Sequence, residues 1–328
     1  MKLGKAIVLV ALGLGSLALL PGCFSMKKTT VEERLLALEK NAPLRGRVQT
    51  LERRVTIGGE ELAASFRYFR AGSSGPDRPV IVLVHGTPSS MVTWTASVLG
   101  PDGLAEDCDV YALEMVGHGT TRTELERYDF ERGAEWIQAF LEALDLRGVT
   151  LVGNSYGGEF AWRAALDDPQ RVARLVLMSS SGFPRRDDEW LPEEVKMREL
   201  SLAKIGWLLN SRERVRGALA PHFQTPVPDE HVEEVYLVCS NRDNWHAMID
   251  LARDENGLRS PELAALQQPT LLLWGAQDVA YRPERFGALF RDTIPRARLE
   301  LLAGAGHYPQ EEQPAAVARA IADFAREE

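Results

Sequence analysis

The stretch LVGNSYGG, residues 151–158, places one serine between glycines directly after a short apolar run. The apolar residues predict a buried strand, and residues 159–166 predict a helix. Glycines on either side of Ser155 lack the Cβ atoms that would clash if the chain reversed sharply there. Gly-x-Ser-x-Gly between a strand and a helix is typical of a nucleophile elbow. The alternative is an ordinary glycine turn with a capping serine.

Other short runs rich in Val and Leu follow from residue 48 onwards. Val48 to Ile57 and Leu62 to Arg70 predict a hairpin around Gly58-Gly59. Six further strands are predicted at 79–86 (PVIVLVHG), 109–115 (DVYALEM), 148–155 (GVTLVGNS), 173–180 (ARLVLMSS), 269–275 (PTLLLWG) and 297–304 (ARLELLAG). Helical patterns such as Glu131 to Leu144 separate several of them. Apolar strands alternating with helices predict an α/β domain with a mostly parallel sheet that has helices on both faces.

The alternation stops between residues 183 and 266, where helical patterns such as Glu193 to Leu209 replace strands. A connection of this length is long for a compact domain, so we expect a helical cap that divides the core into residues 48–182 and 267–328. Its aromatic and imidazole side chains either line an apolar substrate pocket or form the cap's own small core. They are Trp190, Trp207, Phe223, Trp245 and His246.

Two further strand ends supply partners for the serine. Asp278 follows the strand at 269–275, and His307 follows the strand at 297–304. A serine hydroxyl needs a base, and the base needs an orienting acid, so Ser155, Asp278 and His307 form a candidate catalytic triad. The alternatives are a helix-capping role for Asp278 and a loop position for His307.

The turn His85-Gly86-Thr87-Pro88 ends the predicted strand at 79–86. The backbone N–H groups of Thr87 and Tyr156 are the candidate oxyanion-hole donors at this edge of the sheet. His85 is interpreted as a residue that braces this loop.

Five segments together carry a family resemblance: HGTP at 85–88, GHG at 117–119, GNSYGG at 153–158, WGAQD at 274–278 and GAGHYPQEEQP at 304–314. On these motifs the chain resembles the α/β-hydrolase fold superfamily, in the branch with a serine nucleophile and a helical cap. The similarity covers about residues 48 to 327. It implies an eight-stranded sheet with an antiparallel second strand, a cap that shapes the substrate pocket, and neither cofactor nor metal. It also implies a structural role for His118.

The identity of the elbow residue narrows the reaction. Haloalkane dehalogenases and epoxide hydrolases of this branch use aspartate there, whereas Ser155 points to acyl transfer. We expect an enzyme that hydrolyses a carboxylic ester or a related acyl compound through an acyl-enzyme intermediate. Carbon–carbon bond hydrolysis, acyl transfer and perhydrolysis on the same triad stay open, as does a surface binding protein without activity. Substrate identity and oligomeric state also stay open.

Composition limits the partners. The chain has 328 residues and a net charge of −9, and it lacks the basic cluster that tracks phosphates, so small molecules are expected rather than nucleic acid. Cys108 and Cys239 are far apart in sequence and are expected to be separate thiols rather than a disulfide framework.

The first residues predict export. A basic start is followed by an apolar run from Ala6 to Leu20, which is short for a membrane-spanning helix. Leu20-Pro21-Gly22-Cys23 resembles a bacterial lipobox, which predicts a signal peptide over residues 1–23, a lipidated (palmitate-bearing) Cys23 and a tether over residues 24–47. Phe24 favours the outer membrane or periplasmic face of the cell envelope. A plain secretory signal or an uncleaved anchor is the alternative.

Overall fold

The computed structural model describes residues 43–75, 77–191 and 210–327, together with Glu33, Leu36, Ala37 and Arg198. The predicted signal peptide, Cys23 and most of the predicted tether lie outside these residues. Among the described residues, no helix is both long and apolar enough to cross a membrane.

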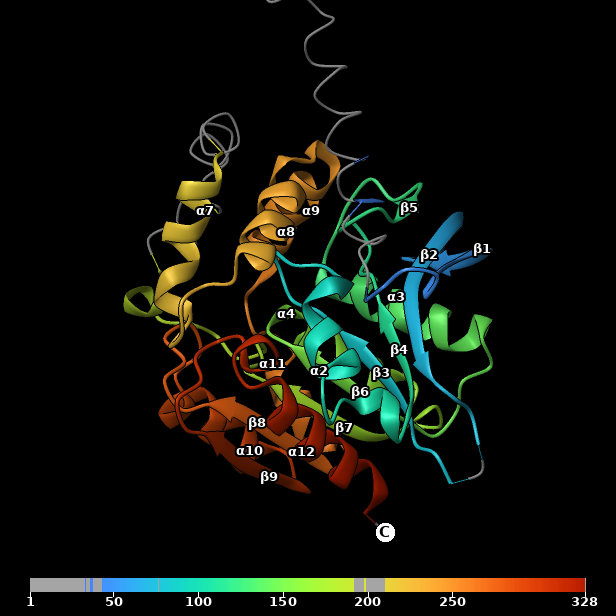
Figure 1. The fold of residues 1–328 in the computed structure, drawn as a ribbon. Coiled ribbons are helices and arrows are strands. Elements are labelled where there is room, and N and C mark those ends of the chain that lie inside the picture. Colours follow the sequence, from blue (N-terminus) through green and yellow to red (C-terminus); the bar gives the residue numbers. More distant parts are fainter. Residues whose placement is uncertain are drawn as a thin grey trace, which may run out of the picture.

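The described chain forms one sheet (Figure 1), with the order β1-β2-β4-β3-β6-β7-β8-β9 and with β5 paired to β2. The strands are β1 (Val48–Ile57), β2 (Glu60–Gly72), β3 (Val80–Val84), β4 (Asp109–Leu113), β5 (Arg122–Thr123), β6 (Val149–Asn154), β7 (Val172–Met178), β8 (Thr270–Gly275) and β9 (Ala297–Leu302). The strands from β4 to β9 along this order are parallel, whereas β2 is antiparallel to β1 and β4. The predicted α/β fold and its antiparallel second strand are confirmed.

The β1–β2 hairpin closes with two residues. Gly58 and Gly59 have φ values of 61° and 79°, which a two-residue turn matching the twist of antiparallel strands requires. Ile57 therefore pairs with Glu60.

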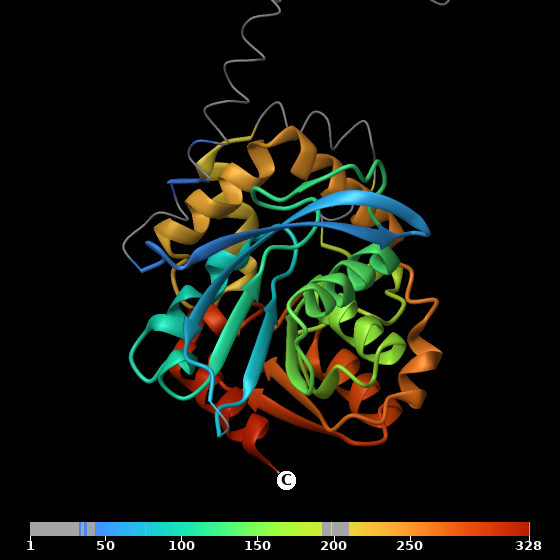
Figure 2. The same cartoon turned by 90° about the vertical axis from the view of Figure 1, so that its right-hand side faces the viewer.

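Side chains alternate between two apolar layers along the central strands. Val82 and Val84 of β3 pack in a core cluster with helices α3 (Phe130–Ala143) and α4 (Tyr156–Asp167). Ile81 and Leu83 pack in a second cluster with α2 (Thr95–Leu99) and α12 (Pro314–Arg326). Figure 2 shows α3 and α4, in green, on one side of the sheet. Helices therefore cover both faces, and the carboxyl ends of the strands stay available for a site.

Helices α7 (Arg212–Leu219), α8 (Asp229–Ser240) and α9 (Arg242–Asp254) lie between β7 and β8 in the chain. They gather at one end of the molecule in yellow and orange (Figure 1). The described part of this segment contains no strand. It has an apolar cluster of its own that includes Val215, Phe223 and Val238. We call residues 183–266 the inserted segment.

The chain is already fixed before β1. Leu44 is 1% exposed and belongs to the core cluster beneath α12, and the Arg70 N–H donates to the Arg47 carbonyl oxygen at 3.1 Å. Residues 43–47, which we expected in the tether, therefore belong to the folded body. Cys108 and Cys239 are buried free thiols, as expected.

Candidate active site

The candidate nucleophile Ser155 lies in the tight turn between β6 and α4. Its φ of 56° and ψ of −124° are values that residues with a side chain seldom adopt. A Cβ atom at Gly153 would lie 2.2 Å from the Gly157 carbonyl oxygen, and one at Gly86 would lie 2.8 Å from the Ser155 Cβ. The Ser155 N–H donates to the Met178 carbonyl oxygen at 3.0 Å. The surrounding backbone therefore holds a strained serine in place, as in a nucleophile elbow.

The candidate acid and base lie in the loops after β8 and β9. His307 Nδ1 is 3.0 Å from Asp278 Oδ2, and both side chains are buried. The other carboxylate oxygen, Oδ1, accepts hydrogen bonds from the N–H groups of Ala280 at 2.8 Å and Tyr281 at 3.1 Å. Because an ionised carboxylate only accepts, this pairing puts the imidazole proton on Nδ1 and leaves Nε2 as the base. The structure thus brings the predicted acid and base together.

Asn154, next to the candidate nucleophile, ties the elbow to the loop of the candidate base. Its amide Nδ2 donates to the His307 carbonyl oxygen at 3.2 Å, and its Oδ1 accepts from Gln310 Nε2 at 3.2 Å. The His307 N–H donates to the carbonyl oxygen of His222, in the inserted segment, at 2.8 Å. Strands β6 and β9 are not neighbours in the sheet, so the sheet alone would not bring the loops after them together. These hydrogen bonds join the two loops.

His118 orients the loop that carries Thr87. Its Nε2 is 2.6 Å from the Thr87 hydroxyl, and its Nδ1 is 3.1 Å from the Val116 carbonyl oxygen. Since a carbonyl only accepts, Nδ1 donates and Nε2 accepts the Thr87 proton. Burial, together with nearby His85, lowers the pKa of His118 to about 3, so the ring is neutral near pH 7. This contact supports the structural interpretation of His118. The oxyanion role of the Thr87 and Tyr156 N–H groups stays a prediction.

His85 holds the same loop in place through hydrogen bonds. Its Nδ1 donates to the Gly86 carbonyl oxygen at 2.8 Å, and its Nε2 accepts from the Met115 N–H at 3.0 Å. These bonds hold the turn before Thr87 against the end of β4.

The predicted pocket residues of the inserted segment lie in different surroundings. Phe223 is buried in the segment's own cluster and stacks on Tyr308 with ring centres 5.0 Å apart. Trp245 packs against the same cluster, and the side chain of His246 is exposed on α9.

Trp190 lies apart from that cluster. The guanidinium groups of Arg185 and Arg198 each lie 4.2 Å from its ring centre. Trp207 falls outside the described residues. A pocket lined by these side chains stays a prediction.

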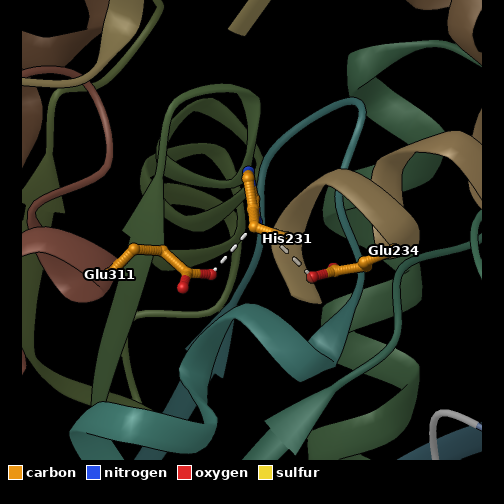
Figure 3. A group of neighbouring side chains, drawn as sticks. All are labelled: His231, Glu234 and Glu311. Atoms are coloured by element: carbon orange, nitrogen blue, oxygen red, sulfur yellow. Dashed lines mark ion pairs between the residues drawn. The ribbon is translucent and has the colours of Figure 1, made fainter. Parts of the chain in front are cut away.

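A buried charged cluster lies between α8 and α11 (Pro309–Glu312), and Figure 3 shows its three side chains. His231 Nδ1 is 3.2 Å from Glu311 Oε1 and 3.5 Å from Glu234 Oε2. The carboxylates are held in turn: Glu234 Oε1 accepts from Ser90 N–H and Oγ, both at 2.7 Å, and Glu311 Oε1 accepts from Thr93 Oγ1 at 2.6 Å. Sequence reasoning missed this cluster.

The charge on this cluster follows from its pKa values. Burial lowers the pKa of His231, but the two carboxylates outweigh it and raise the value to about 10. The spacing of the three side chains is also that of a metal-ligand group, with ligand atoms within 4.8 Å of one another. Near neutral pH, however, a proton occupies the imidazole, and the two carboxylates beside Nδ1 compensate its charge.

A second buried carboxylate that the sequence did not single out lies in the first turn of α4. Glu159 Oε1 pairs with Arg163 Nη2 at 2.5 Å, and its Oε2 accepts from Ser181 Oγ at 2.9 Å. Burial raises the pKa of Glu159 to about 7 despite these partners. The Ser181 N–H also donates to the Ser155 carbonyl oxygen at 3.2 Å, so this group supports the back of the elbow. The Glu159–Arg163 spacing is readable in the sequence, but Ser181 is brought in by the fold.

Comparison with known proteins places this chain among hydrolases. The profile of the alpha/beta hydrolase family matches residues 81–320. A 2-hydroxymuconate semialdehyde hydrolase of Pseudomonas sp. (strain CF600) is 30% identical over 83% of this chain and 94% of its own length. A monoacylglycerol lipase of Homo sapiens is 26% identical over 79% of this chain and 78% of its own length. A solved structure described as a membrane phospholipase A, a novel bacterial virulence factor, is 25% identical, with a TM-score of 0.69, over 94% of this chain and 95% of that one.

Proposed function

Because the chain belongs to the alpha/beta hydrolase family, we propose that it is a serine hydrolase that cleaves a carboxylic ester or a related acyl compound through an acyl-enzyme intermediate. The observation that carries this proposal is the hydrogen bond between His307 and Asp278 at 3.0 Å, at the same end of the sheet as a strained Ser155. A buried imidazole with Nε2 free to accept is the group that activates a serine hydroxyl. The family implies a small-molecule substrate.

The residues have distinct roles in the proposed reaction. Ser155 Oγ attacks the carbonyl carbon while His307 Nε2 takes its proton, and Asp278 keeps the imidazole in the required tautomer. The carbonyl oxygen becomes negative and accepts hydrogen bonds from the Thr87 and Tyr156 N–H groups. One such donor typically contributes about 2.7 to 4 kcal/mol to transition-state stabilisation. His307 then protonates the leaving group, and water activated by the same imidazole releases the acyl group.

Carbon–carbon bond hydrolysis on the same residues is the second candidate. The relative described as a 2-hydroxymuconate semialdehyde hydrolase, 30% identical over 83% of this chain, favours it specifically. Acyl transfer to a second substrate, perhydrolysis, and a binding protein without turnover are weaker alternatives, because no contact described above favours any of them. We also propose that residues 183–266 act as a cap that shapes the substrate pocket.

The anchor is a separate part of the proposal. Cys23 in the lipobox-like Leu20-Pro21-Gly22-Cys23 would carry the lipid and hold the enzyme on the bacterial cell envelope. The likeness to a membrane phospholipase A over 94% of this chain supports a membrane-attached hydrolase.

Ser155→Ala in the full-length chain, purified in mild detergent, tests the catalytic proposal. We expect the turnover of short p-nitrophenyl esters to fall about 10⁴-fold or more, because no other group described here replaces the nucleophile. Ser73→Ala, at an exposed serine after β2, is the matched control and should keep full activity. A fluorophosphonate probe should label the wild type and not Ser155→Ala.

The same assay separates the two candidate reactions. A vinylogous diketone turned over faster than the esters would favour carbon–carbon bond hydrolysis. Undiminished ester turnover by Ser155→Ala would reject the serine mechanism altogether.

A further inference from the structure

Glu255, at the carboxyl end of α9 in the inserted segment, has a buried carboxylate that the proposed reaction does not use. Its Oε2 accepts a hydrogen bond from the Tyr156 hydroxyl at 2.7 Å, and its Oε1 accepts one from the Tyr281 hydroxyl at 2.8 Å. Arg185 Nη1 is 3.7 Å from the same Oε1. One carboxylate therefore joins the inserted segment to two separate loops of the sheet.

Both tyrosines belong to the site through their main chains. Tyr156 follows Ser155 directly, and its N–H is a proposed oxyanion donor. The Tyr281 N–H donates to Asp278 Oδ1 at 3.1 Å, and the Tyr281 ring centre lies 5.6 Å from that of His307. The carboxylate thus holds the side chains of two residues whose main chains serve the oxyanion and the catalytic acid.

The surroundings fix the carboxylate itself. The Arg185 side chain is fully buried, and its guanidinium lies 5.0 Å from the Tyr281 ring centre and 4.2 Å from that of Trp190. A buried carboxylate is costly unless charge and hydrogen bonds compensate it, and here a guanidinium and two phenol hydroxyls do so. Glu255 therefore has little freedom to move without disturbing both tyrosines.

We propose that Glu255 is a positioning residue, which sets the Tyr156 N–H for the oxyanion and the Tyr281 N–H for Asp278. This inference rests on the proposed serine-hydrolase function. It gives the inserted segment a direct part in assembling the site, in addition to shaping a pocket. The contribution is expected in the chemical step, because neither tyrosine contact requires a bound substrate.

Glu255→Gln in the full-length chain tests the inference. A small misplacement of a catalytic group can lower the rate about 100-fold, and we expect a loss of kcat between about 10-fold and 100-fold with KM changed less than threefold. The rate of fluorophosphonate labelling at Ser155, which also depends on the oxyanion donors, should fall in parallel. Tyr68→Phe is the matched control, since it removes a hydroxyl bonded to Gln49 Oε1 at 2.9 Å on the β1–β2 hairpin. It should leave both rates unchanged.

Tyr156→Phe and Tyr281→Phe keep the Glu255 carboxylate. They test the inference if Glu255→Gln does not fold. Each should lower kcat, and the double variant should lose no more activity when Glu255→Gln is added, because the carboxylate acts through these two hydroxyls. A loss confined to melting temperature or KM, with labelling rates equal to Tyr68→Phe, would overturn the inference. Failure of the probe to label the wild type would instead reject the proposed function.

Discussion

Ser155 shows how one residue depends on atoms far away in the chain. Its φ of 56° is maintained by glycines at 86, 153 and 157, each of which would clash if it carried a Cβ atom. Gly86 lies in the loop that carries Thr87. Because Gly86 lacks a Cβ atom, this loop can approach Ser155 closely. The strain is thereby fixed by the fold instead of by local sequence alone.

Asp278→Asn tests the pairing with His307. The amide oxygen can still accept from the Ala280 and Tyr281 N–H groups, which turns the amide nitrogen toward His307 Nδ1. Nδ1 would then have to accept, so the proton would move to Nε2 and the base would be lost. We expect kcat to fall about 10⁴-fold with little change in melting temperature.

Steady-state kinetics with p-nitrophenyl esters and a thermal melt measure this outcome. Asp292→Asn, at an exposed carboxylate in the last turn of α10 (Ala288–Thr293), is the control. A kcat within threefold of wild type would remove Asp278 from the catalytic role.

At this scale the motif residues could be predicted from the sequence, but the residues that hold them in position could not. Asp278 and His307 could be found because each follows an apolar strand in the order that a known family uses. Asn154 and Gln310, which join the two loops at 3.2 Å, have no pattern in sequence, because their meeting depends on how two non-adjacent strands end. The role of Glu255 was missed for a similar reason. In the sequence, an acidic residue at a helix end indicates only a solvent-facing cap.

At the scale of elements, the strands were predicted because each carries its own signal of continuous Val and Leu. The hairpin turn was readable from Gly58-Gly59. Strand β5 was missed because Arg122–Thr123 is only two residues long and exists through its pairing with Ala64 and Ser65 of β2. A strand that forms only through pairing with a distant segment has no hydrophobic periodicity of its own in the sequence.

The stability of the protein around α8 is expected to depend on pH through His231. The folded pKa of about 10 is above the ordinary value near 6.5, so the stabilisation is complete below pH 6.5 and is lost as pH rises through 10. Removing one partner of a buried ion pair costs about 3 to 5 kcal/mol, and His231→Gln should be destabilised by roughly that amount at pH 6. The difference from wild type should shrink as pH approaches 10.

Urea unfolding at several pH values between 6 and 10 measures this effect. His246→Gln, at an exposed histidine on α9, should show no such trend. A destabilisation of His231→Gln that is constant across this range would mean that packing, and not charge, accounts for it.

At the scale of the whole molecule, the inserted segment contacts each loop that carries a proposed catalytic group. Glu255 reaches Tyr156 and Tyr281, the His222 carbonyl accepts from the His307 N–H, and Glu234 binds Ser90 beyond Thr87. These contacts are polar and buried, whereas the segment's apolar cluster is mostly its own. The inserted segment, which we propose shapes the substrate pocket, therefore also helps to hold the loops of the proposed site.

The proposed anchor acts at the same scale, through distance. The folded body begins near residue 43, and residues 24–42 span at most about 65 Å when fully extended. A lipid on Cys23 would keep the site near the membrane surface and raise the effective concentration of a membrane-borne ester without any new contact. Cys23→Ser should then keep its kcat/KM on a soluble ester within twofold of wild type.

Hydrolysis of an ester lipid in vesicles by the same variant should fall about 100-fold. Without the lipid, the enzyme must bind the membrane from solution before it can meet the substrate. Mass spectrometry of the N-terminus checks that wild type carries the lipid and Cys23→Ser does not. Equal rates on vesicles would favour the plain secretory signal, since the catalytic body would then reach the membrane unaided. Because the soluble ester reports on the chemistry alone, the two substrates separate loss of the anchor from damage to the site.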